Sequence, residues 1–445
     1  MKQISLQKIV ESELCTGCGA CVNDPELKMQ WNKNGFLIPD WSNNPEKFEK
    51  QIHLCPFNPD DTVNNEDQLA EEFFKETKEK DLQIGKFQQV YAGYSNDYRN
   101  TSSSGGIATF VFEKLLKDKI VDHLFIVKEV EGSYQYQWFE DWKLIKETSK
   151  TRYIPVTLAQ LFKEINQKEG KVAVSGVACF IKAIRLKQHY HPELKEKIPF
   201  LIGIICGGLK SQFFTDYLSQ KSGIKGDYHQ QQYRIKDRNS SASDYSFGAY
   251  DSKNEFHQMK MKTVGDMWGT GLFKSKACDF CDDVTTELAD ISLGDAWISP
   301  YSKDGLGNSV IITRTLLADE IIRNGIASQE LSCQAISLDL LKKSQAGSFK
   351  HRQLGMKYRL KQLRKEEGIV LNKRIRFLQT IPFEYKIVQK ERMRLRKASL
   401  ALWEKTKNAE KFEQEIKPLK KILSDKTRFY HRMQKLRRIL NLKTI

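Results

Sequence analysis

The sequence has no long hydrophobic run. The longest, at residues 200–206, is far too short to cross a bilayer and predicts a buried strand. The first ten residues lack the apolar stretch of a secretory signal. Cysteine is too sparse for a disulfide scaffold, at 9 residues in 445. Together with the missing signal, the clustered spacing of these cysteines predicts a protein of the reducing cytosol, where thiols serve metals or catalysis.

Acidic residues are scarce near the C-terminus. From residue 352 onward the chain carries 28 Lys and Arg against 9 Asp and Glu, a net charge of +19. Because the whole chain carries +16, the first 351 residues carry −3. We therefore expect a separate basic helical tail, which suits peripheral contact with the inner face of a membrane. A pair of solvated helices and a site for an acidic partner stay open as alternatives, and nucleic acid is the weaker interpretation.

The most specific motif lies near the N-terminus. It is a C-x-x-C-x-x-C run with a glycine in each gap, and it places three thiols on one tight turn, as a 4Fe–4S cluster requires. A distant Cys followed by Pro supplies a fourth ligand in two-cluster ferredoxins, and one such Cys-Pro pair is present here. The predicted ligands are Cys15, Cys18, Cys21 and Cys55. A zinc site is the alternative, although zinc sites seldom use three thiols at this spacing.

Strand-like and helix-like segments alternate after residue 87, which indicates a largely parallel sheet with helices around it. Cys179 and Cys206 each follow a short apolar strand, so both belong at the edge where such sheets bind ligands. Cys278 and Cys281 form a C-x-x-C turn, which by itself also suits zinc or redox chemistry. Together the four thiols form a plausible second 4Fe–4S site, and Cys333 is left as a core residue.

A serine- and glycine-rich loop, residues 102–106, precedes a predicted amphipathic helix. Hydroxyls and free N–H groups at a helix N-terminus can bind an anion, and a dinucleotide pyrophosphate would fit. Ordinary helix capping explains the same pattern. Asp290 and Asp295 are interpreted as turn and cap residues.

Taken together, these motifs resemble the beta-subunit family of coenzyme F420 hydrogenases and dehydrogenases. The motifs are S-S-S-G-G at residues 102–106, S-G-V-A-C at 175–179, C-G-G at 206–208, the C-x-x-C turn, and A-D-I-S-L-G-D-A-W at 289–297. The sequence departs from the family where Gly-Thr-Pro-Cys becomes Gly176-Val177-Ala178-Cys179, and where Gly-Ser-Lys-Tyr becomes Lys150-Thr151-Arg152-Tyr153. Both changes weaken any inference about the substrate.

The resemblance implies an α/β protein with two 4Fe–4S clusters and FAD. The expected domains are a ferredoxin-like 4Fe–4S module at 1–62, a linker at 63–86, a mixed or parallel-sheet FAD domain at 87–350 and the basic helical tail at 351–445. Arg152 and Tyr153 are the expected catalytic residues. The expected flavin contacts are Ser103, Ser104, Gly105, Gly106, Arg152, Ser175 and Gly176.

The implied activity is that of an iron–sulfur flavoprotein oxidoreductase. Electrons would pass from reduced ferredoxin or another donor through the clusters to FAD and on to an organic substrate, with a role in surface polysaccharide synthesis. A second interpretation is an electron-transfer subunit of a larger complex with no substrate site of its own. A third is a zinc-stabilised binding protein. The identity of the substrate does not follow from the sequence.

Overall fold

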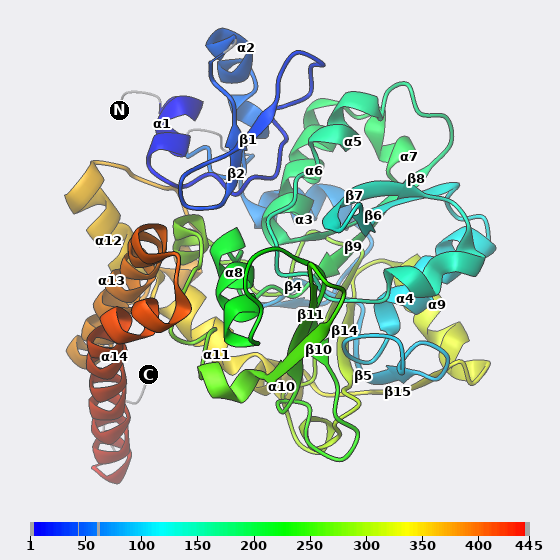
Figure 1. The fold of residues 1–445 in the computed structure, drawn as a ribbon. Helices are drawn as coiled ribbons and strands as arrows, with labels where there is room; N and C mark the ends of the chain where they lie inside the picture. The colour runs from blue at the N-terminus through cyan, green and yellow to red at the C-terminus, as the bar shows by residue number, and fades with distance from the viewer. Residues whose placement is uncertain (1–3, 43, 60–62, 441–445) are drawn as a thin grey trace.

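An eight-stranded mixed sheet forms the centre of the molecule in the computed structural model, which describes residues 4–42, 44–59 and 63–440 (Figure 1). The strand order is β15-β5-β14-β13-β9-β8-β6-β7. The strands are β5 (Gln89–Ser95), β6 (His123–Val130), β7 (Ser133–Phe139), β8 (Val172–Val177), β9 (Phe200–Ile204), β13 (Ile291–Asp295), β14 (Ser309–Thr313) and β15 (Leu331–Ala335).

The four neighbours β13, β9, β8 and β6 run parallel, and the other pairs are antiparallel. The expectation of an α/β fold with a mixed or parallel sheet is therefore confirmed in its mixed form. The apolar run at residues 200–206 supplies β9, whose first four residues are buried. β-branched and aromatic residues in these strands fit a pleated surface that is covered on both faces.

Helices cover both faces of this sheet. One face packs against α4 (Ile107–Lys117) and α9 (Leu316–Ala327). The other face packs against α3 (Glu66–Phe73), α5 (Ala159–Glu164), α6 (Ala178–Tyr190) and α7 (Leu194–Lys197). Apolar residues spaced three and four apart, such as Ile107, Phe110 and Val111 in α4, give each helix one face for the core.

Two smaller units flank the sheet. The N-terminal residues form α1 (Leu6–Glu11), β1 (Met29–Trp31), β2 (Leu37–Pro39) and α2 (Pro45–Glu49), drawn in blue in Figure 1. A three-stranded antiparallel sheet follows α8 (Gln212–Lys221) and consists of β10 (Tyr228–Ile235), β11 (Ser246–Asp251) and β12 (Phe256–Lys260). The segment that follows α8 is therefore β-rich.

The segment expected to be a linker is folded onto the body. It contains α3, β3 (Lys80–Asp81) and β4 (Gly85–Lys86). In α3, Glu66 forms a buried ion pair with Lys182 of α6 at 3.0 Å. The boundary at residue 62 lies outside the described residues, and the division into domains stays a prediction.

The basic C-terminal segment is helical, as expected, but it is not an appendage. Its helices are α12 (Met356–Glu367), α13 (Phe383–Thr406) and α14 (Ala409–Ile439), which follow the short α10 (Leu338–Ser344) and α11 (Ala346–Phe349). Trp403 of α13 is only 1% exposed and packs against Tyr217 of α8, Phe273 and Phe412. This packing could not be predicted from the net charge of the segment. The Lys and Arg side chains lie mainly on the outer faces of helices whose inner faces are apolar. Within the described part of the chain, no helix combines the length and the apolar character needed to span a bilayer.

Candidate metal centres and the adjoining cavity

Five strands of the large sheet, β5, β6, β8, β9 and β13, run in one direction, and four of them end at the edge that carries the site. β5 is antiparallel to β14, and β14 is antiparallel to β13, so β5 runs in the same direction as β8, β9 and β13. The loops beyond their carboxyl ends, together with Thr16 and Gly17 of the N-terminal unit, line a cavity of about 790 Å³. The sequence predicted that Cys179 and Cys206 belong at one edge, and the topology places the loops that carry them there.

The first group of thiols, Cys15, Cys18, Cys21 and Cys55, surrounds a small cavity of about 20 Å³. Burial raises the pKa of Cys15 to about 12, and the neighbouring Cys18 contributes to this rise. The turn depends on glycine, because Gly19 has a φ of +79° and a Cβ there would lie 2.3 Å from Thr157 Oγ1.

The second group comes from three separate parts of the chain. Cys179 lies in the first turn of α6, Cys206 follows β9, and Cys278 and Cys281 lie in and just after the 3₁₀ helix η4 (Lys276–Phe280). Burial raises the pKa of Cys179, and the nearby Cys281, Cys278 and Cys206 raise it further. The structure therefore brings these four thiols together, as the sequence predicted.

Both groups suit a soft metal. Each offers only thiols, and the backbone N–H of Leu209 lies 3.1 Å from Cys278 Sγ in a geometry that stabilises a thiolate. Four buried thiolates at one place repel one another unless a metal supplies positive charge, so the residues present fit such a centre.

The two groups are neighbours. Cys18 of the first group is close enough to Cys179 of the second to raise its pKa. Both residues belong to one hydrophobic cluster together with Leu158, whose backbone N–H donates to the carbonyl of Cys18 at 3.0 Å. The two thiol groups thus meet within one hydrophobic cluster.

The serine- and glycine-rich loop forms one wall of the large cavity. Gly106 caps α4 with a φ of +80°, and a Cβ there would lie 2.7 Å from the carbonyl carbon of Tyr98. Ser103 Oγ accepts from the N–H of Thr151 at 3.0 Å, and Ser104 Oγ donates to the carbonyl of Asn308 at 3.1 Å.

Two buried polar atoms at this wall, Ser102 Oγ and Arg152 Nε, have no hydrogen-bond partner among the described residues. Both residues line the cavity, and burial lowers the pKa of Arg152. Unpaired donors beside a helix N-terminus fit a ligand that carries phosphate. Ser175 and Gly176, at the end of β8, also line the cavity, and the Ser175 carbonyl accepts from the Tyr136 hydroxyl at 2.8 Å.

Aromatic rings also line the cavity. Tyr153 packs edge-on against Trp268 at 4.8 Å and Tyr233 at 5.3 Å between ring centroids, and burial raises the pKa of Tyr153 well above its usual value. Beside it, Arg234 pairs with Asp295 at 2.5 Å. The sequence did not point to Arg234 or Trp268, because neither belongs to a motif and only folding brings them to the cavity.

The remaining residues singled out in the sequence have structural roles. Asp290 accepts from Leu201 N–H at 2.8 Å and from Arg185 at 2.9 Å, so it joins β9 to α6. Cys333 lies on the edge strand β15 and packs against the core, as expected.

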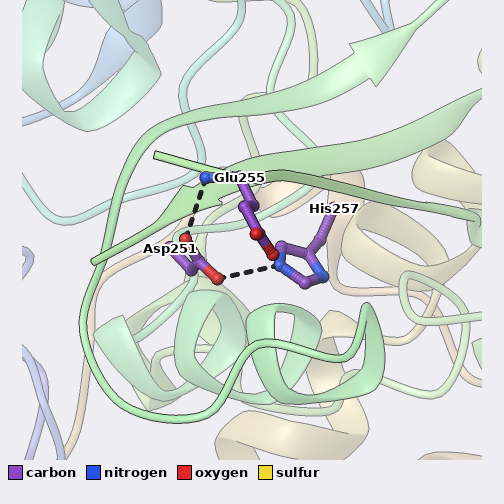
Figure 2. Close-up of side chains that lie close together, drawn as sticks. All are labelled: Asp251, Glu255 and His257. Atoms are coloured by element: carbon purple, nitrogen blue, oxygen red, sulfur yellow. Dashed lines mark hydrogen bonds and ion pairs between the residues drawn. The ribbon is translucent and has the colours of Figure 1, made fainter. Parts of the chain in front are cut away.

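One other group of potential ligands lies on the β11–β12 hairpin (Figure 2). The carboxylate of Asp251 accepts from the backbone N–H of Glu255 at 2.9 Å and lies 3.0 Å from His257 Nε2. These contacts account for the hairpin turn without an ion.

The fold and the site define an α/β protein in which two thiol groups adjoin one large cavity. Residues 90–163 match the model of the coenzyme F420 hydrogenase/dehydrogenase beta subunit N-terminal region, and residues 169–339 match that of its C-terminal region. The matches cover more than half of the chain, which therefore belongs to this family.

Named relatives are redox proteins. The coenzyme F420 hydrogenase subunit beta of Methanosarcina barkeri is 25% identical over 280 residues, 59% of this chain and 89% of that protein. An F(420)H(2) dehydrogenase subunit of Methanosarcina mazei is 22% identical over 68% of this chain and 82% of its own length. The coenzyme F420-dependent sulfite reductase of Methanocaldococcus jannaschii is 25% identical over 74% of this chain, which spans about half, 48%, of that relative.

A chain of the F420-reducing NiFe hydrogenase complex from Methanosarcina barkeri shares the fold, with a TM-score of 0.50 at 21% identity. The match covers 66% of this chain and 99% of that chain. A substantial part of the present chain therefore has no counterpart there, and the family models end at residue 339. The assignment of the chain to a family of oxidoreductases agrees with the resemblance drawn from its motifs.

Proposed function

We propose that this chain is an electron-transfer subunit that holds two 4Fe–4S centres and FAD and passes electrons to a partner protein. The observation that carries the proposal is that Cys18 of the first thiol group and Cys179 of the second pack in one hydrophobic cluster. The cavity supports it, because its lining includes Gly17 beside the first group and Cys206 of the second.

The names of two relatives support the subunit interpretation over a self-contained reductase, since both are called subunits. Reduced ferredoxin is the donor class that the N-terminal module suits. Reduction of an organic substrate by the isolated chain is the second candidate, and the size of the cavity, about 790 Å³, favours it. A role in surface polysaccharide synthesis stays a prediction.

The residues that line the cavity would have separate roles in binding the flavin and in proton transfer. The iron–sulfur centres would supply one-electron transfer and the flavin two-electron chemistry. Ser103, Ser104 and Gly106 line the cavity at the N-terminus of α4 and would face a phosphate there, and Arg152 adds a cation. The expected contact Gly105 does not line the cavity and packs against Gly93 and Ser309 instead. Tyr153 lines the cavity and, like any tyrosine, carries its proton at neutral pH, so its hydroxyl would be the proton donor there.

The direct test is the colour and composition of the protein purified without oxygen. We expect a brown protein with flavin absorption that contains about eight iron atoms per chain, the content of two 4Fe–4S clusters. Iron analysis, acid-labile sulfide and the extracted flavin measure this. A colourless protein that contains zinc would support the binding-protein interpretation instead.

The same preparation separates the two redox interpretations. Reduced ferredoxin should bleach the flavin of the isolated chain, while the electrons leave only when a partner protein or an artificial acceptor is added. Turnover of an organic substrate by the isolated chain would favour the second candidate.

We further propose that the end of α14 docks on an anionic lipid surface. Phe429, Leu436 and Leu440 are 45%, 50% and 64% exposed, and their spacing of seven and four residues puts them on one helix face. Phe383 of α13, 71% exposed, lies at the same end, because its neighbour Glu384 pairs with Arg437 of α14 at 2.7 Å.

Charge favours an anionic lipid surface as the occupant of this face. Residues 417–440 contain nine Lys and Arg and one Asp. A second copy of the chain would bring the same positive charge, whereas an anionic bilayer complements it and accepts the apolar side chains. Figure 1 shows α13 and α14 (orange to red) on the outer side of the molecule, where a flat surface can approach them.

Vesicle flotation tests this docking. The full chain should float with vesicles that contain phosphatidylglycerol at low salt and less so at high salt, because salt screens the charges. Replacing Phe429 and Leu436 by Ser should weaken binding by more than about tenfold, since each large apolar side chain contributes about 1.5–3 kcal/mol on burial. The matched control is Leu316→Ser on α9, a Leu that is 57% exposed. If the wild-type chain floats no better than the double variant, or does not float at low salt, the docking proposal is wrong.

A further inference from the structure

Arg352 lies beyond the residues that the family models match, yet its side chain reaches the second thiol group. It belongs to the π-helical turn η6 (Lys350–Leu354) and is 6% exposed. In the sequence it is the first cation of the segment expected to be a tail. Folding buries it beside the second thiol group.

The guanidinium of Arg352 contacts two of the three chain segments that carry the second thiol group. Nη2 donates to Cys281 Sγ, and Nε donates to the Cys281 carbonyl at 3.1 Å. Nη1 donates to the carbonyl of Cys206 at 2.7 Å. A third carbonyl, that of Asp283, accepts from Nη2 at 2.5 Å. The planar guanidinium group therefore links the C-x-x-C turn to the end of β9 through hydrogen bonds.

The C-terminal helices hold both Arg352 and the turn in place. Arg359 of α12 donates to the carbonyls of Arg352 at 2.8 Å and of Asp279 at 2.5 Å. Asp279 lies between the two cysteines of the turn, and its carboxylate pairs with Arg396 of α13 and with Lys274, each at 2.8 Å. The position of Arg352 beside the sulfur is thus fixed by several long-range contacts.

The first thiol group has a weaker positive environment. Cys15 Sγ accepts from the backbone N–H of Gly17 at 3.4 Å. The nearby cation Lys182, which acts on Cys55, has its charge offset by Glu66 at 3.0 Å. At the second group, by contrast, Arg352 places an N–H directly on a ligand sulfur.

We infer that Arg352 is a positioning residue that holds Cys281 as a metal ligand and makes the reduction potential of the second centre higher than that of the first. Hydrogen bonds and positive charge at a ligand sulfur stabilise the reduced, more negative form of an iron–sulfur centre. One electron then moves from the first centre, which is oxidised, to the second, which is reduced, with no proton required. The inference rests on the proposed function, because it requires both centres.

The test is a redox titration of the oxygen-free full chain, followed by electron paramagnetic resonance. In the wild-type protein, the second centre should take up the electron first. In Arg352→Gln, the equilibrium share of the electron on the second centre relative to the first should fall at least tenfold, which is 59 mV for a one-electron centre. The first centre serves as the internal control, and its own potential should not change.

Each outcome decides the inference. Unchanged potentials in Arg352→Gln with full iron content would overturn it. If Arg352→Gln loses the iron of the second centre only, Arg352→Lys decides: recovery of the iron and of the order of potentials supports a role for the charge at the sulfur. Failure of Arg352→Lys to recover them assigns Arg352 to folding alone and overturns the inference. Absence of iron from the wild-type chain would instead refute the proposed function.

Discussion

Cys278→Ser is expected to remove the second metal centre and leave the first in place. Iron should fall from about eight to about four atoms per chain. Reduction of the flavin through the first centre should slow by more than about 100-fold, because loss of a ligand exceeds the about 10–100-fold that loss of an outer partner costs. Anaerobic stopped-flow mixing with reduced ferredoxin measures the rate at the flavin absorption band.

The physical reason is the route through the core. Cys278 and Cys281 complete the group that contains Cys179, and Cys179 is the residue that lies close to Cys18 of the first group. The matched control is Cys333→Ser, because Cys333 lies on β15 and packs against another part of the core. Iron content and rate should both stay at the wild-type level in that control. Rapid flavin reduction in Cys278→Ser would show that electrons bypass the second centre and would contradict the proposed route.

Trp403→Ala is expected to lower the free energy of unfolding by about 3–5 kcal/mol, the usual cost of truncating a fully buried Trp. Its ring centroid lies 5.6–5.8 Å from those of Tyr217, Phe273 and Phe412, so the cavity left behind would open between α8, α13 and α14. Urea denaturation followed by circular dichroism, under the same oxygen-free conditions for all variants, measures the change.

The control for this stability prediction is Trp31→Ala, because Trp31 is 53% exposed on β1. It removes the same side chain and should change the free energy of unfolding far less. If the residues beyond 351 formed a separate tail, Trp403→Ala would leave the main unfolding transition unchanged. That result would mean that the helices beyond residue 351 do not stabilise the body.

The motifs that could be predicted from sequence are those whose geometry is local. Three thiols spaced by two residues share a turn, and a serine–glycine loop before an amphipathic helix forms a helix N-terminus, whatever surrounds them. The alternation of strands and helices also places Cys179 and Cys206 at one sheet edge, because parallel strands end together. These parts of the fold and of the candidate site therefore follow from short stretches of sequence.

Other features arise from contacts between distant segments. Arg352 is one of 28 cations in a basic stretch, and nothing in its immediate neighbours distinguishes it from those that face solvent. Its contact with Cys281 exists because α12 and α13 pack against the turn around Asp279. Likewise, Arg234 and Trp268 reach the cavity from parts of the chain that carry no motif.

By itself, then, the sequence determined the family, the eight cysteines proposed as ligands and the mixed α/β class, because spacing along a chain sets which groups share a turn or a strand end. Tertiary structure alone decided that the two thiol groups adjoin through Cys18 and Cys179 and that the basic helices are part of the core. Net charge and local pattern do not report on such features, since burial of a helix face and contact between remote residues depend on how the whole chain packs.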